Sequence, residues 1–194
     1  MVGGAKALTA RAAWHAAAAL ALLLSGGAVA QPLETVGSCR DGLANGAFEL
    51  RMRNGQLRVA GAFARGRRTG TFIFWSASGA RIAVVPYDDD VKTGTVALWY
   101  PPAGAQGEIA RKFETPFADG AVHGEVRAWH PDGKRRGEYR YVNGTLVAAL
   151  AWTARGAPLQ EAKARAQADR DAAQSEQYYA SLERLIAANG PRCD

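Results

Sequence analysis

The chain has 194 residues, a formal net charge of +6 and 48% hydrophobic residues. This length is enough for one domain with a real core but hardly for two. Its 24 Lys and Arg residues are spread along the chain and form no basic stripe, so we expect no nucleic-acid partner.

Residues 1–30 are predicted to be a signal peptide. Lys6 and Arg11 precede an apolar run at 16–24, and Ala28-Val29-Ala30 supplies the small residues that signal peptidase requires. Cleavage after Ala30 would leave about 164 residues with a charge of about +4. The run is too short to span a bilayer, no later stretch has the roughly 20 apolar residues needed, and no Cys follows for a lipid anchor. We therefore expect a soluble periplasmic or secreted protein without a transmembrane segment.

After a short mature segment at 31–38, five repeated units are predicted at 39–157. Each unit has an aromatic residue, a Gly three positions later and a second Gly four positions after that; in three units a Trp follows. The second position of the five units is Gly46, Gly70, Gly94, Gly124 and Ala148. The step is about 24 residues, with one step of about 30 that we assign to a turn-rich insert at 101–107. A fixed period of this length indicates stacked supersecondary units.

Each unit is expected to form two short antiparallel strands. Leu57, Val59 and Phe63 alternate with other residues, as on one face of a strand, and Asn54-Gly55 and Asn143-Gly144 are typical of tight hairpin turns. The pattern predicts a mainly β protein, a meander of hairpins with about ten strands in all.

The stretch 117–133, FADGAVHGEVRAWHPDG, resembles a MORN repeat. The similarity is to the variant found in bacterial exported proteins and in a family named as antitoxins of toxin–antitoxin systems. It covers about residues 40–156 and is strongest at 63–79 and 117–144; Asp90, Ala148 and Cys39 depart from it, so the end units are expected to be caps. The resemblance implies an elongated single-layer antiparallel sheet that binds other molecules and has no catalytic residues.

Residues 158–189 are predicted to form one long helix, followed by a tail at 190–194. This stretch is rich in Ala, Glu, Gln, Lys and Arg and contains no Gly; Pro158 suits a first helical position and Gly190-Pro191 a stop. Its second half has an apolar face, whereas the first half offers only alanines and is expected to pack more loosely. The apolar residues are Tyr178, Tyr179, Leu182, Leu185 and Ile186.

Cys39 and Cys193 are expected to form a disulfide, as an even pair in an exported chain suggests. A helix of about 32 residues spans roughly 48 Å, and ten strands extend over roughly 43 Å. A helix that returns along the sheet would therefore bring Cys193 to the first unit, where Cys39 occupies the aromatic position.

Trp75, Trp99 and Trp129 lie five residues after the second Gly, out of phase with the apolar positions two and four residues after it. They are expected on the face opposite the helix, where with Tyr100 they would form a binding surface. Two alternatives are open: both faces could be covered, or bulges could turn the rings inward.

The arginines Arg65, Arg67 and Arg68, and the basic run at 134–136, could hold anionic lipid phosphates. The alternative is a solvated edge that discourages aggregation. His123 and His130 occupy turn positions, and the run 88–90 lacks the ligand spacing of a calcium loop. We therefore expect no enzyme activity, cofactor or metal.

The preferred hypothesis is an exported, non-enzymatic module that binds an unknown protein or acts as a scaffold in the cell envelope. The alternatives are a peripheral binder of anionic membrane surfaces and an antitoxin or immunity protein. The last rests on the family name alone.

Overall fold

The structure is a computed structural model that describes residues 33–101 and 110–193. The predicted signal peptide and most of the predicted insert lie outside the described residues.

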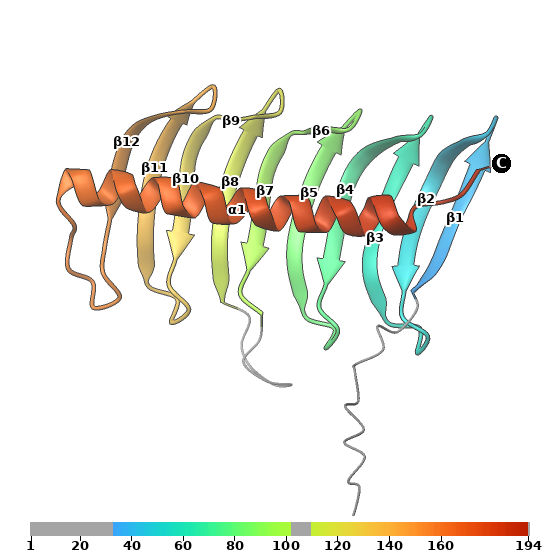
Figure 1. The fold of residues 1–194 in the computed structure, drawn as a ribbon, viewed down its shortest axis with the longest axis horizontal. Coiled ribbons are helices and arrows are strands. Elements are labelled where there is room, and N and C mark those ends of the chain that lie inside the picture. The colour runs from blue at the N-terminus through green and yellow to red at the C-terminus, as the bar shows by residue number, and fades with distance from the viewer. Residues whose placement is uncertain (1–32, 102–109, 194) are drawn as a thin grey trace, which may run out of the picture. The chain divides into compact units, whose positions relative to one another are not determined.

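The described chain forms one antiparallel sheet of hairpins and one long helix, which confirms the predicted fold class (Figure 1). The strand order along the 12-stranded sheet is β1-β2-β3-β4-β5-β7-β8-β10-β11-β12, with the short strand β6 paired to β5 and β9 paired to β8. The strands are β1 Glu34–Arg40, β2 Leu43–Arg51, β3 Leu57–Ala64, β4 Arg67–Trp75, β5 Arg81–Asp88, β6 Val91–Lys92, β7 Gly94–Trp99, β8 Arg111–Ala118, β9 Ala121–Val122, β10 Gly124–Trp129, β11 Arg135–Val142 and β12 Thr145–Ala151.

The hairpin turns depend on residues that accept a left-handed backbone. Asn143 and Gly144 have φ of 47° and 79°, the conformation that tight hairpin turns need. The third unit has Asp90 where the repeat pattern has Gly, yet its φ is 70°. Asp tolerates this region, and its carboxylate here accepts a hydrogen bond of 3.0 Å from the Arg68 backbone N–H. The departure from the repeat is therefore compensated locally.

Helix α1, Glu161–Asn189, runs along one face of the sheet from the β12 end to the β1 end (Figure 1). It begins three residues after Pro158 because the preceding segment still pairs with the sheet: the Leu159 N–H donates to the Ala151 carbonyl at 2.8 Å. Its buried residues recur every three or four positions and face the sheet core. They are Ala164, Ala168, Asp171, Ser175, Tyr179, Leu182 and Ile186.

The chain after α1 reaches the first strand. Cys193 is bonded to Cys39 with a Cα–Cα distance of 5.7 Å, so the predicted disulfide is confirmed. The Thr35 hydroxyl also donates to the Asn189 carbonyl at 2.7 Å. Strand β1 begins at Glu34, inside the segment 31–38 for which no strand was predicted. Its pairing with β2 and its contacts with the C-terminal tail account for that strand.

Candidate functional site

The sheet face turned away from α1, called the open face below, carries an uncharged row across the middle strands. Val59, Phe74 and Leu98 point to the core beneath α1, so the residues alternating with them lie on the open face. Ile73 and Val84 in this row are half-buried, and Ala97 is 9% exposed. The cross-strand neighbours in the row are Ala60, Ile73, Val84 and Ala97.

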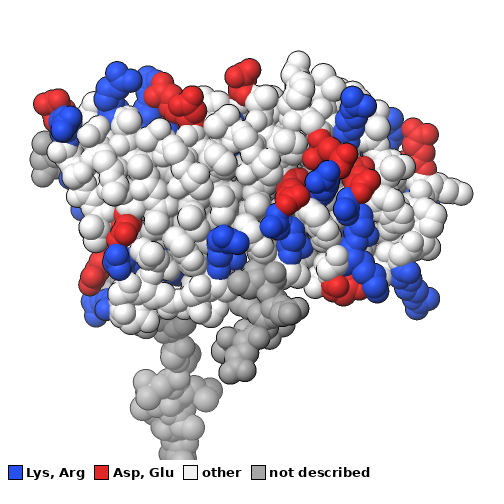
Figure 2. Space-filling view, turned by 180° about the vertical axis from the view of Figure 1, so that it is seen from behind, with Lys and Arg blue, Asp and Glu red and all other residues white. Residues whose placement is uncertain are grey.

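The same row becomes charged toward the β12 end. Ala97 pairs with Glu114, which pairs with Arg127, which in turn pairs with Glu138. Figure 2 shows this face: charged side chains are sparse over its middle, gather over the part toward the β12 end and are present again toward the β1 end. At the other end of the row, Ala60 pairs with Glu49 of β2. The uncharged row over β3–β7 is therefore flanked by charged residues on both sides.

The three tryptophans lie beside this row on the open face. Each is opposite an arginine of the following strand, in the pairs Trp75–Arg81, Trp99–Arg111 and Trp129–Arg135. A register shift occurs at every pair, but the extra residue is on the arginine strand, so the bulge does not turn the tryptophan toward α1.

Trp99 is held between two guanidinium groups. The Cζ atoms of Arg81 and Arg111 lie 4.5 Å and 4.9 Å from its ring centroid, a cation–π geometry. Trp99 is consequently only 8% exposed, whereas Trp75 and Trp129 are half-buried. The binding role predicted for these rings stays a prediction, and Trp99 has less surface to offer than the other two.

Tyr100, the fourth aromatic residue of the predicted surface, is tied into the fold. Its hydroxyl donates to the Trp129 carbonyl at 2.9 Å and accepts from Arg136 Nη1 at 3.2 Å. Burial raises the pKa of Tyr100, while the nearby Arg136 opposes that rise. Through Arg136, which also pairs with Asp171 of α1, these contacts place the Tyr100 hydroxyl on the helix side of the sheet and not with the tryptophans on the open face. The binding role predicted for Tyr100 stays a prediction.

The predicted arginine cluster is largely matched by carboxylates. Arg67 forms an ion pair with Asp89, and Arg68 Nε lies 2.6 Å from an Asp90 carboxylate oxygen. Arg65 is exposed at the turn before β4. The cluster therefore presents less net positive charge than its sequence suggests.

A buried carboxylate that the sequence analysis missed fixes the first half of α1. Asp171 is 4% exposed and accepts hydrogen bonds of 2.8 Å from the Tyr139 hydroxyl and from Gln167. Arg136 Nη2 lies 3.0 Å from the same carboxylate. Burial, together with the Asp171 charge, raises the pKa of Tyr139 above its usual range. The signal in the sequence was the three- and four-residue spacing of position 171 with the buried alanines.

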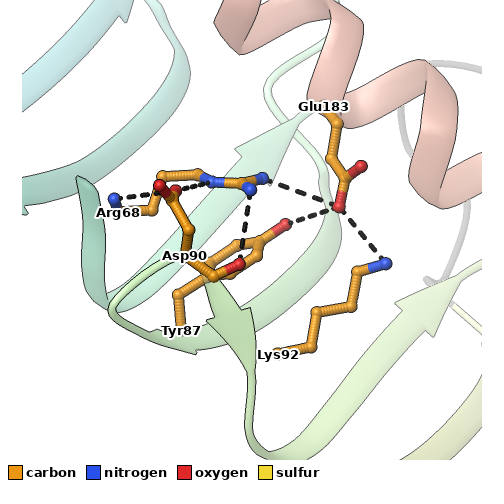
Figure 3. Close-up of polar contacts among 5 residues, drawn as sticks. All are labelled: Arg68, Tyr87, Asp90, Lys92 and Glu183. Atoms are coloured by element: carbon orange, nitrogen blue, oxygen red, sulfur yellow. Dashed lines mark hydrogen bonds and ion pairs between the residues drawn. The ribbon is translucent and has the colours of Figure 1, made fainter. Parts of the chain in front are cut away.

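A second polar group, the Glu183 cluster, fixes the other half of α1; it consists of Arg68, Tyr87, Asp90, Lys92 and Glu183 (Figure 3). Glu183 Oε1 lies 3.2 Å from Lys92 Nζ and 3.6 Å from Arg68 Nη1, and it accepts a hydrogen bond of 3.3 Å from Tyr87. The Arg68 Cζ atom lies 4.3 Å from the Tyr87 ring centroid. Here basic side chains of the sheet extend toward the helix, and Arg68 and Glu183 line a second cavity of about 290 Å³.

Between the two polar groups, a cavity of about 290 Å³ lies between α1 and strands β8, β10 and β11; we call it the α1 cavity. The Tyr179 hydroxyl is buried there near the Thr115 and Ser175 hydroxyls, and it forms no well-aligned hydrogen bond among the residues that the structure describes. Burial is the main cause that raises the pKa of Tyr179, to about 12. The aromatic rings that line the cavity are Phe113, Phe117, Tyr139, Tyr141 and Tyr179.

The two histidines of the described chain lie in turn contacts. A ring nitrogen of His123 is 2.9 Å from the Asn143 side-chain oxygen, and one of His130 is 3.1 Å from the Trp152 carbonyl. Over residues 33–101 and 110–193, no three His, Cys, Asp or Glu side chains are grouped to hold a metal ion. The helix in that part of the chain is not apolar enough to cross a membrane.

Comparison with protein-family models and with curated proteins finds no match to this chain.

Proposed function

We propose that this protein is an exported, non-enzymatic repeat protein that binds another protein through the open face of its sheet. The observation that carries the proposal is the difference between the two faces: α1 covers one, and the other presents an uncharged row beside half-buried tryptophans (Figure 2). Exposed apolar surface rimmed by charge is typical of protein interaction sites.

We further propose that the repeated units are MORN-like. The hairpin of each unit and the step of about 24 residues support this assignment. A stack of such units grows along one axis and offers an extended surface for a partner.

The charge distribution favours a protein partner over an anionic membrane surface. Asp89 and Asp90 pair with Arg67 and Arg68, which reduces the attraction of that turn for lipid phosphates. The alternating charges of Glu114, Arg127 and Glu138 suit a partner that carries both signs.

The test compares two substitutions in one row of the open face. Val84→Glu puts a charge in the middle of the uncharged row. Leu150→Glu, the control, lies opposite Glu138 on β12, where the side chain is already 59% exposed. Each protein would be cross-linked in envelope extract and the attached proteins identified by mass spectrometry. We expect the wild type and Leu150→Glu to retain one common partner and Val84→Glu to lose it, with unchanged circular dichroism. Equal cross-linking by all three proteins, or no specific partner for the wild type, would contradict the proposal.

A further inference from the structure

The position two residues before the second Gly of each unit changes character along the sheet. It is Arg68 in the second unit and Lys92 in the third, but Val122 in the fourth and Leu146 in the fifth. Arg68 and Lys92 extend to Glu183 of α1 (Figure 3). Val122 instead lines the α1 cavity. The cavity thus lies in the part of the sheet where the repeat lacks a basic side chain.

The groups that surround the basic side chains elsewhere are present around the cavity. The Tyr87 ring, on which Arg68 lies, corresponds in the repeat to Phe117 and Tyr141, and both line the cavity. Lys92 Nζ lies 5.8 Å from the Phe117 centroid, whereas the Tyr141 ring has no such cation among the described residues. On the helix, Glu176 precedes Glu183 by seven residues, or about 10.5 Å. This distance is close to the width of two strands, about 9.6 Å. Glu176 therefore lies over the fourth unit at the position that Glu183 has over the third.

Glu176 lacks the basic partner that its counterpart Glu183 has, and the Tyr179 hydroxyl is a second polar group at the cavity. Glu176 lines the cavity, and within the described ranges no lysine or arginine pairs with it, in contrast to Glu183. The buried Tyr179 hydroxyl lies near the Thr115 and Ser175 hydroxyls but forms no well-aligned hydrogen bond in the same ranges, so it can accept from an N–H donor. The Tyr179 ring already has one cation beside it, because Lys92 Nζ lies 4.9 Å from its centroid.

We propose that the α1 cavity binds a small organic cation, an ammonium or guanidinium group on an apolar or aromatic stem. The stem packs between Phe113, Val126 and Tyr139, and the charged group meets Glu176 and the Tyr179 hydroxyl. In the fourth unit the ligand supplies the cationic group that Lys92 supplies to Glu183 in the third unit. An anionic molecule of the same shape should bind more weakly, because the unpaired Glu176 carboxylate repels it. This site lies on the helix side of the sheet and is separate from the proposed protein-binding face.

Three probes of nearly the same shape test the charge requirement in the mature protein: phenethylammonium, 2-phenylethanol and phenylacetate. Binding is followed by the methyl NMR signals of Val122 and Val126, with Val59 and Val85 as references beneath the other half of α1. We expect phenethylammonium to shift the first pair alone, to bind about tenfold more tightly than the alcohol, and to bind more tightly still than the carboxylate.

Two substitutions locate the effect. Glu176→Gln keeps the shape of the exposed side chain and should bring the affinity for phenethylammonium to within about twofold of that for the alcohol. Val122→Lys introduces the residue type of the third unit and should abolish binding by filling the site from within. Equal affinities of the wild type for the three probes, an unchanged preference for the cation in Glu176→Gln, or undiminished binding by folded Val122→Lys would overturn the proposal. The Glu176→Gln result decides alone if Val122→Lys does not fold.

Discussion

Tyrosine is the residue type whose ionisation is most closely tied to the fold. All 6 tyrosines of the chain have raised pKa values, and burial is the first cause for each. Tyr87 and Tyr139 donate hydrogen bonds to carboxylates of α1, which disfavours the phenolate further. Each phenol therefore stabilises the native state only while it keeps its proton.

This pattern predicts loss of stability in alkaline solution. In the unfolded chain the phenols ionise near pH 10, whereas in the folded chain their pKa values lie higher. Above about pH 10 the unfolded state thus binds fewer protons, and the free energy of unfolding falls by about 1.4 kcal/mol per pH unit for each such phenol. Tyrosinate absorbance and circular dichroism recorded against pH should change together. Full ionisation of several tyrosines near pH 10 with the sheet intact would contradict the expectation, and Tyr139→Phe should reduce the slope.

Helix α1 is held at two separate places, by Asp171 over the β11 end and by Glu183 over the β4–β6 end. The two sites differ in burial: the Asp171 side chain is 5% exposed and the Glu183 side chain 36%. Removing one partner of a buried ion pair is costly because the remaining charge is neither paired nor solvated. An exposed ion pair contributes little to the free energy of unfolding. Asp171 should therefore control the docking of α1 more strongly than Glu183.

We predict that Asp171→Asn lowers the free energy of unfolding by about 3 kcal/mol because Arg136, whose side chain is 14% exposed, loses its counter-charge. The matched control is Asp169→Asn on the same helix, where the side chain is exposed; its effect should stay below about 0.5 kcal/mol. Urea denaturation followed by circular dichroism measures both. The docking role assigned to Asp171 would be wrong if the two variants had equal midpoints.

The parts of the fold that could be predicted from the sequence are those set by local geometry. Gly spacing, turn pairs such as Asn143-Gly144 and the helix length determine hairpins, sheet extension and the meeting of Cys39 with Cys193. Asp171 could not be predicted in its role, because that role depends on which helix face meets Arg136 across the sheet. Arg136 itself reaches that face next to the bulge at Trp129, which alternation alone does not reveal.

At the scale of the whole molecule, the sheet grows by contacts between neighbouring strands, so its end strands depend on few partners. Strand β1 is such an end: all seven of its residues are exposed, and it pairs with β2 alone. The Cys39–Cys193 disulfide ties this strand to the last segment of the described chain, with a sequence separation of 154. The bond therefore joins the two ends of the repeat array through the helix.

Replacing both cysteines by alanine should lower the free energy of unfolding by about 5 kcal/mol, the value expected from the loop entropy of the unfolded chain. The loss of stability should differ between parts of the fold. Amide hydrogen exchange should quicken most in β1 and in the last turn of α1. Strand β11 pairs on both sides and packs against α1 through Tyr139, so its exchange rates should rise only by the amount that the lower global stability explains. A reductant should destabilise the wild type by a similar amount and leave the double variant unaffected. Equal exchange rates in β1 of both proteins would mean that pairing with β2 alone holds the strand, and that the disulfide acts only on the unfolded chain.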